Sequence, residues 1–265
     1  MHQRKYDLVF SLSQACSCTS ALRKANLQVF SYPFDWLFGS DFSGRIDILC
    51  NDFEGFLNKD DLVFSGPGEV IKTDVYKNPK NGLVFNHDFQ TGLSLDEAYP
   101  LVQEKYNRRI SRLSELIEQA RHVLVVFIET PDTPLTTTGA MLKKGQKKLH
   151  KRFGEKMDLL YIQIRRDIPF RRRQDIYITD AVRQVSFDYD AHNKKHAYMP
   201  KYGLLLKILK EYQRTGAQPR KGKTKLKTIC ARLISGMIPL PKYRRAVRQK
   251  LMPRKGDGSL STDME

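Results

Sequence analysis

The chain is 265 residues long and carries a formal net charge of +17, with 40% hydrophobic and 28% charged residues. This length accommodates one well-packed domain with an appendage, and the balance is that of a globular protein. No stretch approaches the ~18 to 20 apolar residues that a transmembrane helix needs, and the first residues lack the small-residue cleavage site of a signal peptide. The cysteines, at irregular spacing, favour a reducing compartment over a disulfide framework. We therefore expect a cytoplasmic protein.

The first part of the body alternates between strand and helix patterns. An apolar run at residues 6–12 predicts a buried strand, residues 17–27 predict a helix, and residues 29–32 predict a second strand. The following stretch is less regular, with a helix expected over residues 45–57 and short strands near 62–64 and 83–86.

The second part of the body continues this alternation with stronger patterns. A long helix is expected over residues 94–120, with Ser94 as N-cap and Glu97 in the capping-box position. The run at 123–129 reads as a central parallel strand. A helical pattern at 143–156 then leads to strands at 159–164 and 182–187. This order predicts an α/β fold with a mainly parallel sheet, flanking helices and a Rossmann-like strand order, with a papain-like fold as the alternative.

The positive charge is concentrated in the carboxyl-terminal segment. Residues 219–255 hold 13 Lys or Arg and no Asp or Glu, and they begin with a Pro, Gly and Lys stretch typical of a linker. We place a boundary near Gln218, which separates a domain of residues 1–218 from a tail of residues 219–265.

Within this tail, apolar residues recur at helical spacing and Lys and Arg lie between them. The pattern predicts basic amphipathic helices that bind an anionic membrane surface through residues 225–251, which would make the protein peripheral at the inner membrane face. Alternatively, the apolar face packs on the body and the charges are solvated. Nucleic acid fits less well, because Tyr243 is the only aromatic residue in the run.

Cys16 is the first candidate for chemistry. It lies between the first predicted strand and the first predicted helix, at the sheet edge where open α/β folds bind ligands. Backbone N–H groups and the helix dipole stabilise a thiolate at a helix N-terminus, and the same groups can form an oxyanion hole. The structural alternative is a buried cysteine acting as a small apolar residue.

His87 is the candidate base, since it follows a predicted strand and a Cys and His pair is the minimal activated thiol. Its alternative is a structural histidine with a satisfied hydrogen bond. His192 and His196 are the reserve candidates, whereas His122 and His150 lie in surroundings typical of structural histidines.

Two further groups of residues are candidates for substrate contact. In the segment SYPFDWL, Asp35 could orient His87 or bind substrate and Trp36 could wall the pocket, while the alternative places the aromatic residues in the core. Arg108 and Arg109 suit an anionic substrate. Arg108 and Arg112 share a helical face, and the alternative is that this face is solvated.

Metal and cofactor sites are not predicted. The cysteines and histidines lack Cys-x-x-Cys or His-x-x-x-His spacing. There is also no glycine-rich phosphate loop and no GxSxG elbow, so a serine nucleophile is less favoured than the thiol.

The ordered motifs Ser-Leu-x-x-x-Cys, Pro-Phe-Asp-Trp and Phe-x-His resemble a family of bacterial proteins described as papain-like cysteine peptidases, a domain of unknown function. The resemblance covers roughly residues 5–210 and departs at Ser13, where a glycine is expected. It implies that Cys16 is the nucleophile and His87 the base. Asp35 and Asp88 are the candidates for a third member of the site.

The tail segment IPLPKYRRAVRQKLM is similar to basic carboxyl-terminal segments of bacterial enzymes that assemble lipopolysaccharide or capsule at the membrane, which implies a glycan-assembly setting. The leading hypothesis is a thiol-dependent hydrolase or acyl transferase that acts on a peptide, acyl or glycan substrate. The alternatives are a surface-polysaccharide transferase or modifying enzyme and a noncatalytic membrane-peripheral binding protein.

Overall fold

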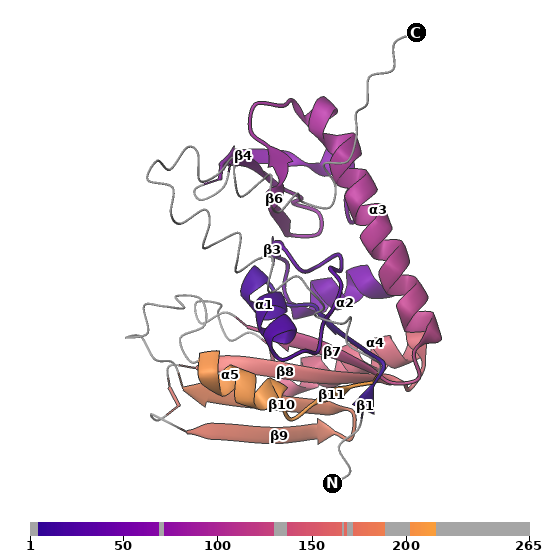
Figure 1. The fold of residues 1–265 in the computed structure, drawn as a ribbon, viewed down its shortest axis with the longest axis vertical. Coiled ribbons are helices and arrows are strands. Elements are labelled where there is room, and N and C mark those ends of the chain that lie inside the picture. Colours follow the sequence, from indigo (N-terminus) through magenta and orange to yellow (C-terminus); the bar gives the residue numbers. More distant parts are fainter. Residues whose placement is uncertain are drawn as a thin grey trace, which may run out of the picture. The chain divides into compact units, whose positions relative to one another are not determined.

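The computed structural model describes residues 5–68, 72–129, 137–165, 167–168, 172–188 and 202–215, all within one compact unit, Met1–Gly216 (Figure 1). The tail of residues 219–265 and the boundary predicted near Gln218 lie outside the described residues. The membrane-binding helices predicted there therefore stay a prediction.

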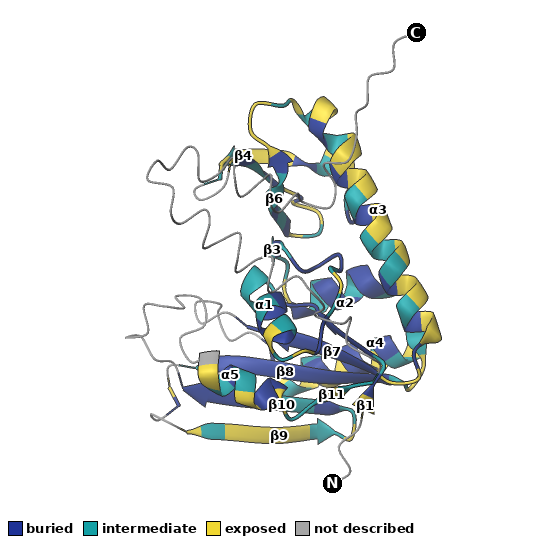
Figure 2. Ribbon diagram, viewed as in Figure 1, coloured by how far each residue is buried: buried dark blue, intermediate teal, exposed yellow. Residues whose placement is uncertain are grey.

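The central sheet has five strands in the order β2-β7-β8-β10-β9. These strands are β2 (Leu8–Ser11), β7 (Val123–Ile128), β8 (Met157–Arg165), β10 (Val182–Asp188) and β9 (Arg173–Thr179). The first four run parallel, and β9 pairs antiparallel with β10 at the edge. Every residue of β7 is buried, as its continuous apolar sequence requires of a central strand. Burial falls toward the edge of the sheet: β8 is almost entirely buried, whereas β9 is largely exposed (Figure 2).

Helices cover both faces of this sheet. One hydrophobic cluster joins the even-numbered positions of β7 to α1 (Cys16–Lys24) and α5 (Tyr202–Leu209). The other joins the odd-numbered positions to α2 (Phe42–Cys50), α3 (Leu95–Gln119) and α4 (Gly139–Phe153). The strict alternation along β7 thus divides the core into two layers.

A second sheet of four strands has the order β3-β6-β5-β4 and is antiparallel throughout. Its strands are β3 (Leu37–Gly39), β6 (Leu83–Gln90), β5 (Thr73–Lys77) and β4 (Val63–Pro67), and a 3-10 helix, η1 (Lys59–Asp61), precedes β4. A short parallel pair joins β1 (Lys5–Tyr6) to β11 (Gln213–Arg214). The chain is therefore a mixed α/β protein with several sheets, and the prediction of a mainly parallel sheet is not borne out.

The predicted strand over residues 29–32 is wrong, because side chains bind the backbone groups that a strand would use. Asp35 accepts a hydrogen bond from the N–H of Tyr32, and Gln28 donates to the carbonyl of Phe30. The next strand is β3, farther along the chain. The helix expected over residues 45–57 is also displaced to α2, and Asp52 and Phe53 adopt positive φ values of 54° and 63° after it.

The long helix α3 agrees closely with its prediction. Ser94 is the N-cap, and its side chain and that of Glu97 form the reciprocal capping box. In the part of the chain that the structure describes, no helix combines the length and apolar character needed to cross a membrane.

Candidate functional site

Cys16 is the first residue of α1 and is partly exposed. The preceding residue, Ala15, is the N-cap and its side chain makes no capping hydrogen bond, so the first turn has no side chain that satisfies its N–H groups. Burial raises the pKa of the Cys16 thiol, and the backbone N–H groups of Cys16 and Ser17 oppose this effect. The thiol therefore faces donors that are suited to a developing negative charge.

The loop before Cys16 is fixed by two serines. Ser13 Oγ accepts a hydrogen bond from the N–H of Ile128 at 2.6 Å and contacts Cys18 Sγ at 2.9 Å. Ser11 Oγ accepts from the N–H of Ser13 at 3.0 Å and contacts the same sulfur at 3.2 Å. Ser13, which stands where a glycine is expected, thus anchors the loop to β7. Cys18 is fully buried, and burial raises its pKa to about 12, so it is a structural thiol.

Arg45 of α2 holds this loop against the second sheet, and no motif or spacing in the sequence predicts this role. The side chain is fully buried and donates to the carbonyls of Leu12 and Ser13 at 3.3 and 2.7 Å. It also donates to the carbonyls of Leu37 and Gly39 of β3, at 2.8 to 3.1 Å. One guanidinium thereby joins the loop before Cys16 to the strand that pairs with β6.

One face of α1 points at the turn that carries Asp35 and Trp36. Cys16, Thr19 and Arg23 share this face because helical positions three and four apart are neighbours. Thr19 Oγ1 donates to Asp35 Oδ1 at 3.0 Å, and the Arg23 guanidinium lies 6.0 Å from the centroid of the Trp36 ring. The Cys16 position is therefore aligned with this turn.

Asp35 holds the turn together. It is 1% exposed, and it accepts hydrogen bonds from Thr19, from Gln28 and from the N–H of Tyr32. Burial raises the pKa of its carboxyl, and these hydrogen bonds oppose the rise. No hydrogen bond joins Asp35 to His87, although the structure describes both.

His87 lies in an irregular part of β6. The β5–β6 pairing shifts register between Asp74, opposite Phe89, and Tyr76, opposite Phe85, so residues 86–88 form a bulge. Bulges re-aim side chains and are frequent next to active sites. The ring of His87 lies 6.1 Å from Trp36 and 6.0 Å from Phe38, centroid to centroid.

The imidazole of His87 keeps an unused polar atom. Its Nδ1 is buried without a hydrogen-bond partner, and no hydrogen bond joins it to Cys16 within the described residues. Trp36 lies against His87 and also against Arg23, which shares the α1 face of Cys16. Catalytic hydrogen bonds are often long in the absence of substrate, so a missing hydrogen bond between Cys16 and His87 does not exclude them as a catalytic pair.

Asp88 points to α3 instead of to the thiol. Its carboxylate binds the ammonium of Lys105 and accepts from the hydroxyl of Tyr106 at 2.9 Å. Asn86, on the other side of His87 in the sequence, has a buried side-chain oxygen without a partner. The structure thus brings neither predicted carboxylate into contact with His87.

The arginines of α3 have different surroundings. Arg108 is exposed and lies 3.5 Å from Glu104. Arg109 lies over the ring of Tyr106, and its Nη1 is buried without a hydrogen-bond partner. Arg112 donates to the carbonyl of Ser31.

The remaining candidates have other positions. His150 Nε2 lies 2.8 Å from the carbonyl of Met157, and the backbone N–H of His122 binds Asp7. His192 and His196 lie outside the described residues. Among the described residues, no group of three or more His, Cys, Asp or Glu side chains could hold a metal ion.

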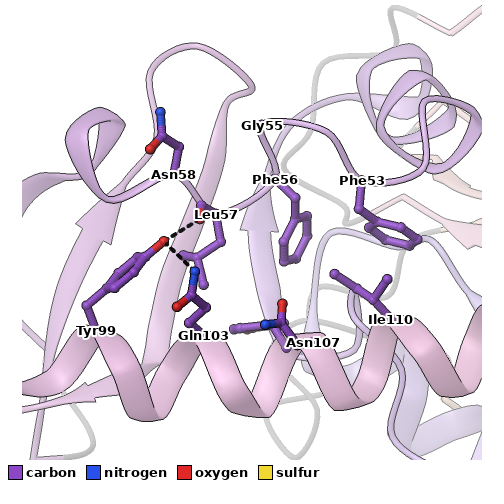
Figure 3. A pocket seen from close by; sticks show the side chains of 10 residues that line it. Phe53, Gly55, Phe56, Leu57, Asn58, Tyr99, Gln103, Asn107 and Ile110 are labelled. Carbon is purple, nitrogen blue, oxygen red and sulfur yellow. Dashed lines mark hydrogen bonds between the residues drawn. The ribbon is translucent and has the colours of Figure 1, made fainter.

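A separate pocket of about 280 Å³ lies between α3 and the segment after α2 (Figure 3). Tyr99 donates a hydrogen bond to the carbonyl of Leu57 and accepts one from Gln103 at its rim, and Phe53 and Phe56 line it. Neither Cys16 nor His87 lines this pocket.

Comparison with known proteins relates the chain to a described family. A sequence model of the family "Putative papain-like cysteine peptidase (DUF1796)" matches residues 7–163, a range that includes Cys16 and His87. The "Uncharacterized protein R408" of Acanthamoeba polyphaga mimivirus is 28% identical over 135 residues, which are 45% of this chain and 60% of that protein. The chain thus matches less than two thirds of that curated relative, and the relative is viral, so the expected bacterial origin is not confirmed. No solved structure matches the chain significantly.

Proposed function

Because the chain belongs to the family "Putative papain-like cysteine peptidase (DUF1796)", we propose that it is a thiol-dependent hydrolase or acyl transferase with Cys16 as nucleophile and His87 as base. One observation carries the proposal. Cys16 begins a helix whose first turn has no side-chain cap, on the face that points to Trp36, and Trp36 contacts His87. His87 therefore borders the same aromatic side chain as Arg23, which lies two turns after Cys16 on one face of α1.

The proposed reaction follows from the state of the thiol. Burial raises the pKa of Cys16, so the free protein holds a neutral thiol and the base must remove its proton during attack. The sulfur adds to an amide or ester carbonyl while His87 takes the proton. The backbone N–H groups of Cys16 and Ser17 face the oxyanion, and His87 returns the proton to the leaving group. Water or another acceptor then attacks the thioester and releases the acyl group.

Asp35 and Asp88 have indirect roles in this proposal. Asp35 positions the turn that carries Trp36, through its bonds to Thr19 and to the N–H of Tyr32. Asp88 ties the bulge of β6 to α3 through Lys105. Each is a positioning residue.

An active ester tests the proposal without knowledge of the natural substrate. Acylation of a thiol by p-nitrophenyl acetate releases one p-nitrophenolate per active chain before slower turnover begins. We expect a burst of one equivalent from the wild-type protein and none from Cys16→Ala, measured by stopped-flow absorbance.

Cys50 supplies the matched control, since it is also a partly exposed free thiol. Cys50→Ala should keep the full burst. A burst that survives Cys16→Ala, or a wild-type protein without one, would contradict the proposal.

A further inference from the structure

Three arginines from separate elements converge beside the turn at residues 30–36. Arg23 of α1 donates from Nη2 to the hydroxyl of Ser31 at 2.7 Å, and Arg112 of α3 donates from Nη1 to the carbonyl of the same residue at 3.3 Å. Arg214 of β11 lies near enough to Tyr32 for its charge, like those of Arg112 and Arg23, to oppose the rise that burial causes in the pKa of the phenol. Two of the arginines thus bind Ser31, and the charge of all three acts on the next residue, Tyr32.

Among the described residues, the three positive charges of this cluster have one carboxylate beside them. In the part of the chain that the structure describes, this carboxylate is that of Asp35, 3.9 Å from Arg23, and three other donors already share it. The Nε atoms of Arg23 and Arg214 are buried and have no hydrogen-bond partner. Like charges that converge with unused donors are stabilised by an anion, and guanidinium groups suit carboxylate and phosphate.

Arg23 connects the cluster to the side of α1 that begins with Cys16. The guanidinium of Arg23 lies 6.0 Å from the Trp36 ring, and the ring of His87 lies 6.1 Å from Trp36. Arg23 also follows Cys16 by two turns on one face of α1, a separation of ~10 Å along the helix axis. A substrate that reaches from the thiol along Trp36 would place its far end at the arginines.

We propose that Arg23, Arg112 and Arg214 bind an anionic group, a carboxylate or a phosphate, on the acyl substrate of Cys16. The link to the substrate rests on the proposed function. The binding of an anion does not, and it can be measured without any reaction.

Trp36 makes binding directly observable, because it is the only tryptophan of the chain and contacts Arg23. Inorganic phosphate is titrated at constant ionic strength, with sodium chloride as the compensating salt. Trp36 fluorescence and the thermal unfolding midpoint are both recorded, since an anion that binds the native state also raises its stability. We expect a saturable response in wild type and in Cys16→Ala.

The decisive variants are Arg112→Gln and Arg214→Gln. The second breaks no side-chain hydrogen bond among the described residues, so it tests the charge without loss of fold. Each should weaken phosphate binding about tenfold or more, as expected for loss of a charged hydrogen bond or ion pair. Arg152→Gln on α4 is the control for total charge, because Arg152 is exposed and pairs with Asp52 at the surface. The phosphate affinity of this variant should differ from that of wild type by less than about twofold.

Three outcomes would overturn the inference: no saturable response by either method, unchanged affinity in both decisive variants, or an equal loss in Arg152→Gln. A second arm identifies the source of the anion. Acylation by mono-p-nitrophenyl sebacate, whose free carboxylate can reach along α1, should be faster than acylation by p-nitrophenyl acetate, and Arg214→Gln should reduce this preference. Phosphate binding without an ester burst would contradict the proposed function alone, whereas a burst without anion binding would contradict this inference alone.

Discussion

The thiol of Cys16 is subject to two opposing effects. Burial disfavours the thiolate and raises its pKa, while the N–H groups of Cys16 and Ser17 favour the charged form. Burial is the larger effect, so the sulfur is protonated near neutral pH. Its nucleophilicity then depends on a base, which explains why the position of His87 matters more to the proposed reaction than the helix dipole does.

Arg45 holds the loop that precedes Cys16. Burial lowers the pKa of its guanidinium to about 9. The guanidinium donates hydrogen bonds to carbonyls of the loop before Cys16 and of β3. Loss of the side chain would leave those buried carbonyls without partners, while the packing on Phe34 would also be lost.

Arg45→Met should lower the free energy of unfolding by about 2 to 4 kcal/mol, because several buried acceptors lose their donor at once. Urea denaturation followed by circular dichroism measures the change. Arg152→Met removes an exposed arginine instead and should stay within about 0.5 kcal/mol of wild type. Equal stability of the two variants would show that the buried guanidinium is not a structural link.

At the scale of elements, β3 and β6 fit together through two glycines. Gly39 has φ of 64°, and a Cβ placed there would lie 2.2 Å from the carbonyl oxygen of Gly82. That oxygen accepts the N–H of Ser40 at 2.8 Å. The close approach fixes the end of β3, and the register of β3 on β6 sets His87 beyond the last pair, next to Trp36.

Gly39→Ala should therefore cost more stability than the positive φ alone explains. Gly55 is the matched comparison, since its φ is 65° and a Cβ there meets nothing within 4 Å. We expect Gly55→Ala to cost about 1 to 2 kcal/mol, the usual penalty of the left-handed conformation. The loss of unfolding free energy in Gly39→Ala, measured by urea denaturation, should be clearly larger than that in Gly55→Ala. Similar losses would mean that the backbones at Gly39 and Gly82 can separate without penalty.

At the scale of the whole molecule, one hydrophobic core serves both large sheets. The same cluster contains Phe10 and Phe127 of the central sheet and Phe85 and Phe89 of the antiparallel sheet. The sheet whose strand β2 leads to Cys16 and the sheet that carries His87 are thus packed in one core, and disturbance of either sheet should affect both catalytic candidates.

The basic tail of residues 219–265 leads to a prediction about membrane attachment. We propose that residues 225–251 attach the protein to anionic membranes, because each Lys or Arg near such a surface contributes ~1 kcal/mol of attraction. The full chain should float with phosphatidylserine vesicles and remain behind with neutral phosphatidylcholine vesicles. Flotation that persists after deletion of residues 219–265 would refute the role of the tail.

Local patterns were predictable, whereas long-range contacts were not. The run Val123–Ile128 and the capping box of Ser94 depend on neighbours in sequence, and both were predicted. The turn after Gln28 was not, because Asp35 captures the N–H of Tyr32 and overrides the β-propensity of the segment.

The site shows the same division. Cys16 at a helix start follows from local sequence, but the bulge around His87 depends on the register of β5 on β6. Asp88 adjoins His87 in sequence, yet its carboxylate binds Lys105 of α3. From the sequence alone, the buried Arg45 looks like any solvated arginine on an amphipathic helix, because its partners are carbonyls from distant segments.

Alkylation of Cys16 by iodoacetamide in the native protein tests the central claim most directly. Mass spectrometry gives the rate at each cysteine between pH 5 and 10, in wild type and in His87→Ala. Because burial raises the pKa of Cys16, loss of the base should move its reaction to pH values above those of an ordinary thiol and slow it at least about tenfold at pH 7. Cys50, whose pKa burial raises to about 11, should react at one slow rate in both proteins. Equal rates at Cys16 with and without His87, or a Cys16 that stays unmodified in wild type, would contradict the account.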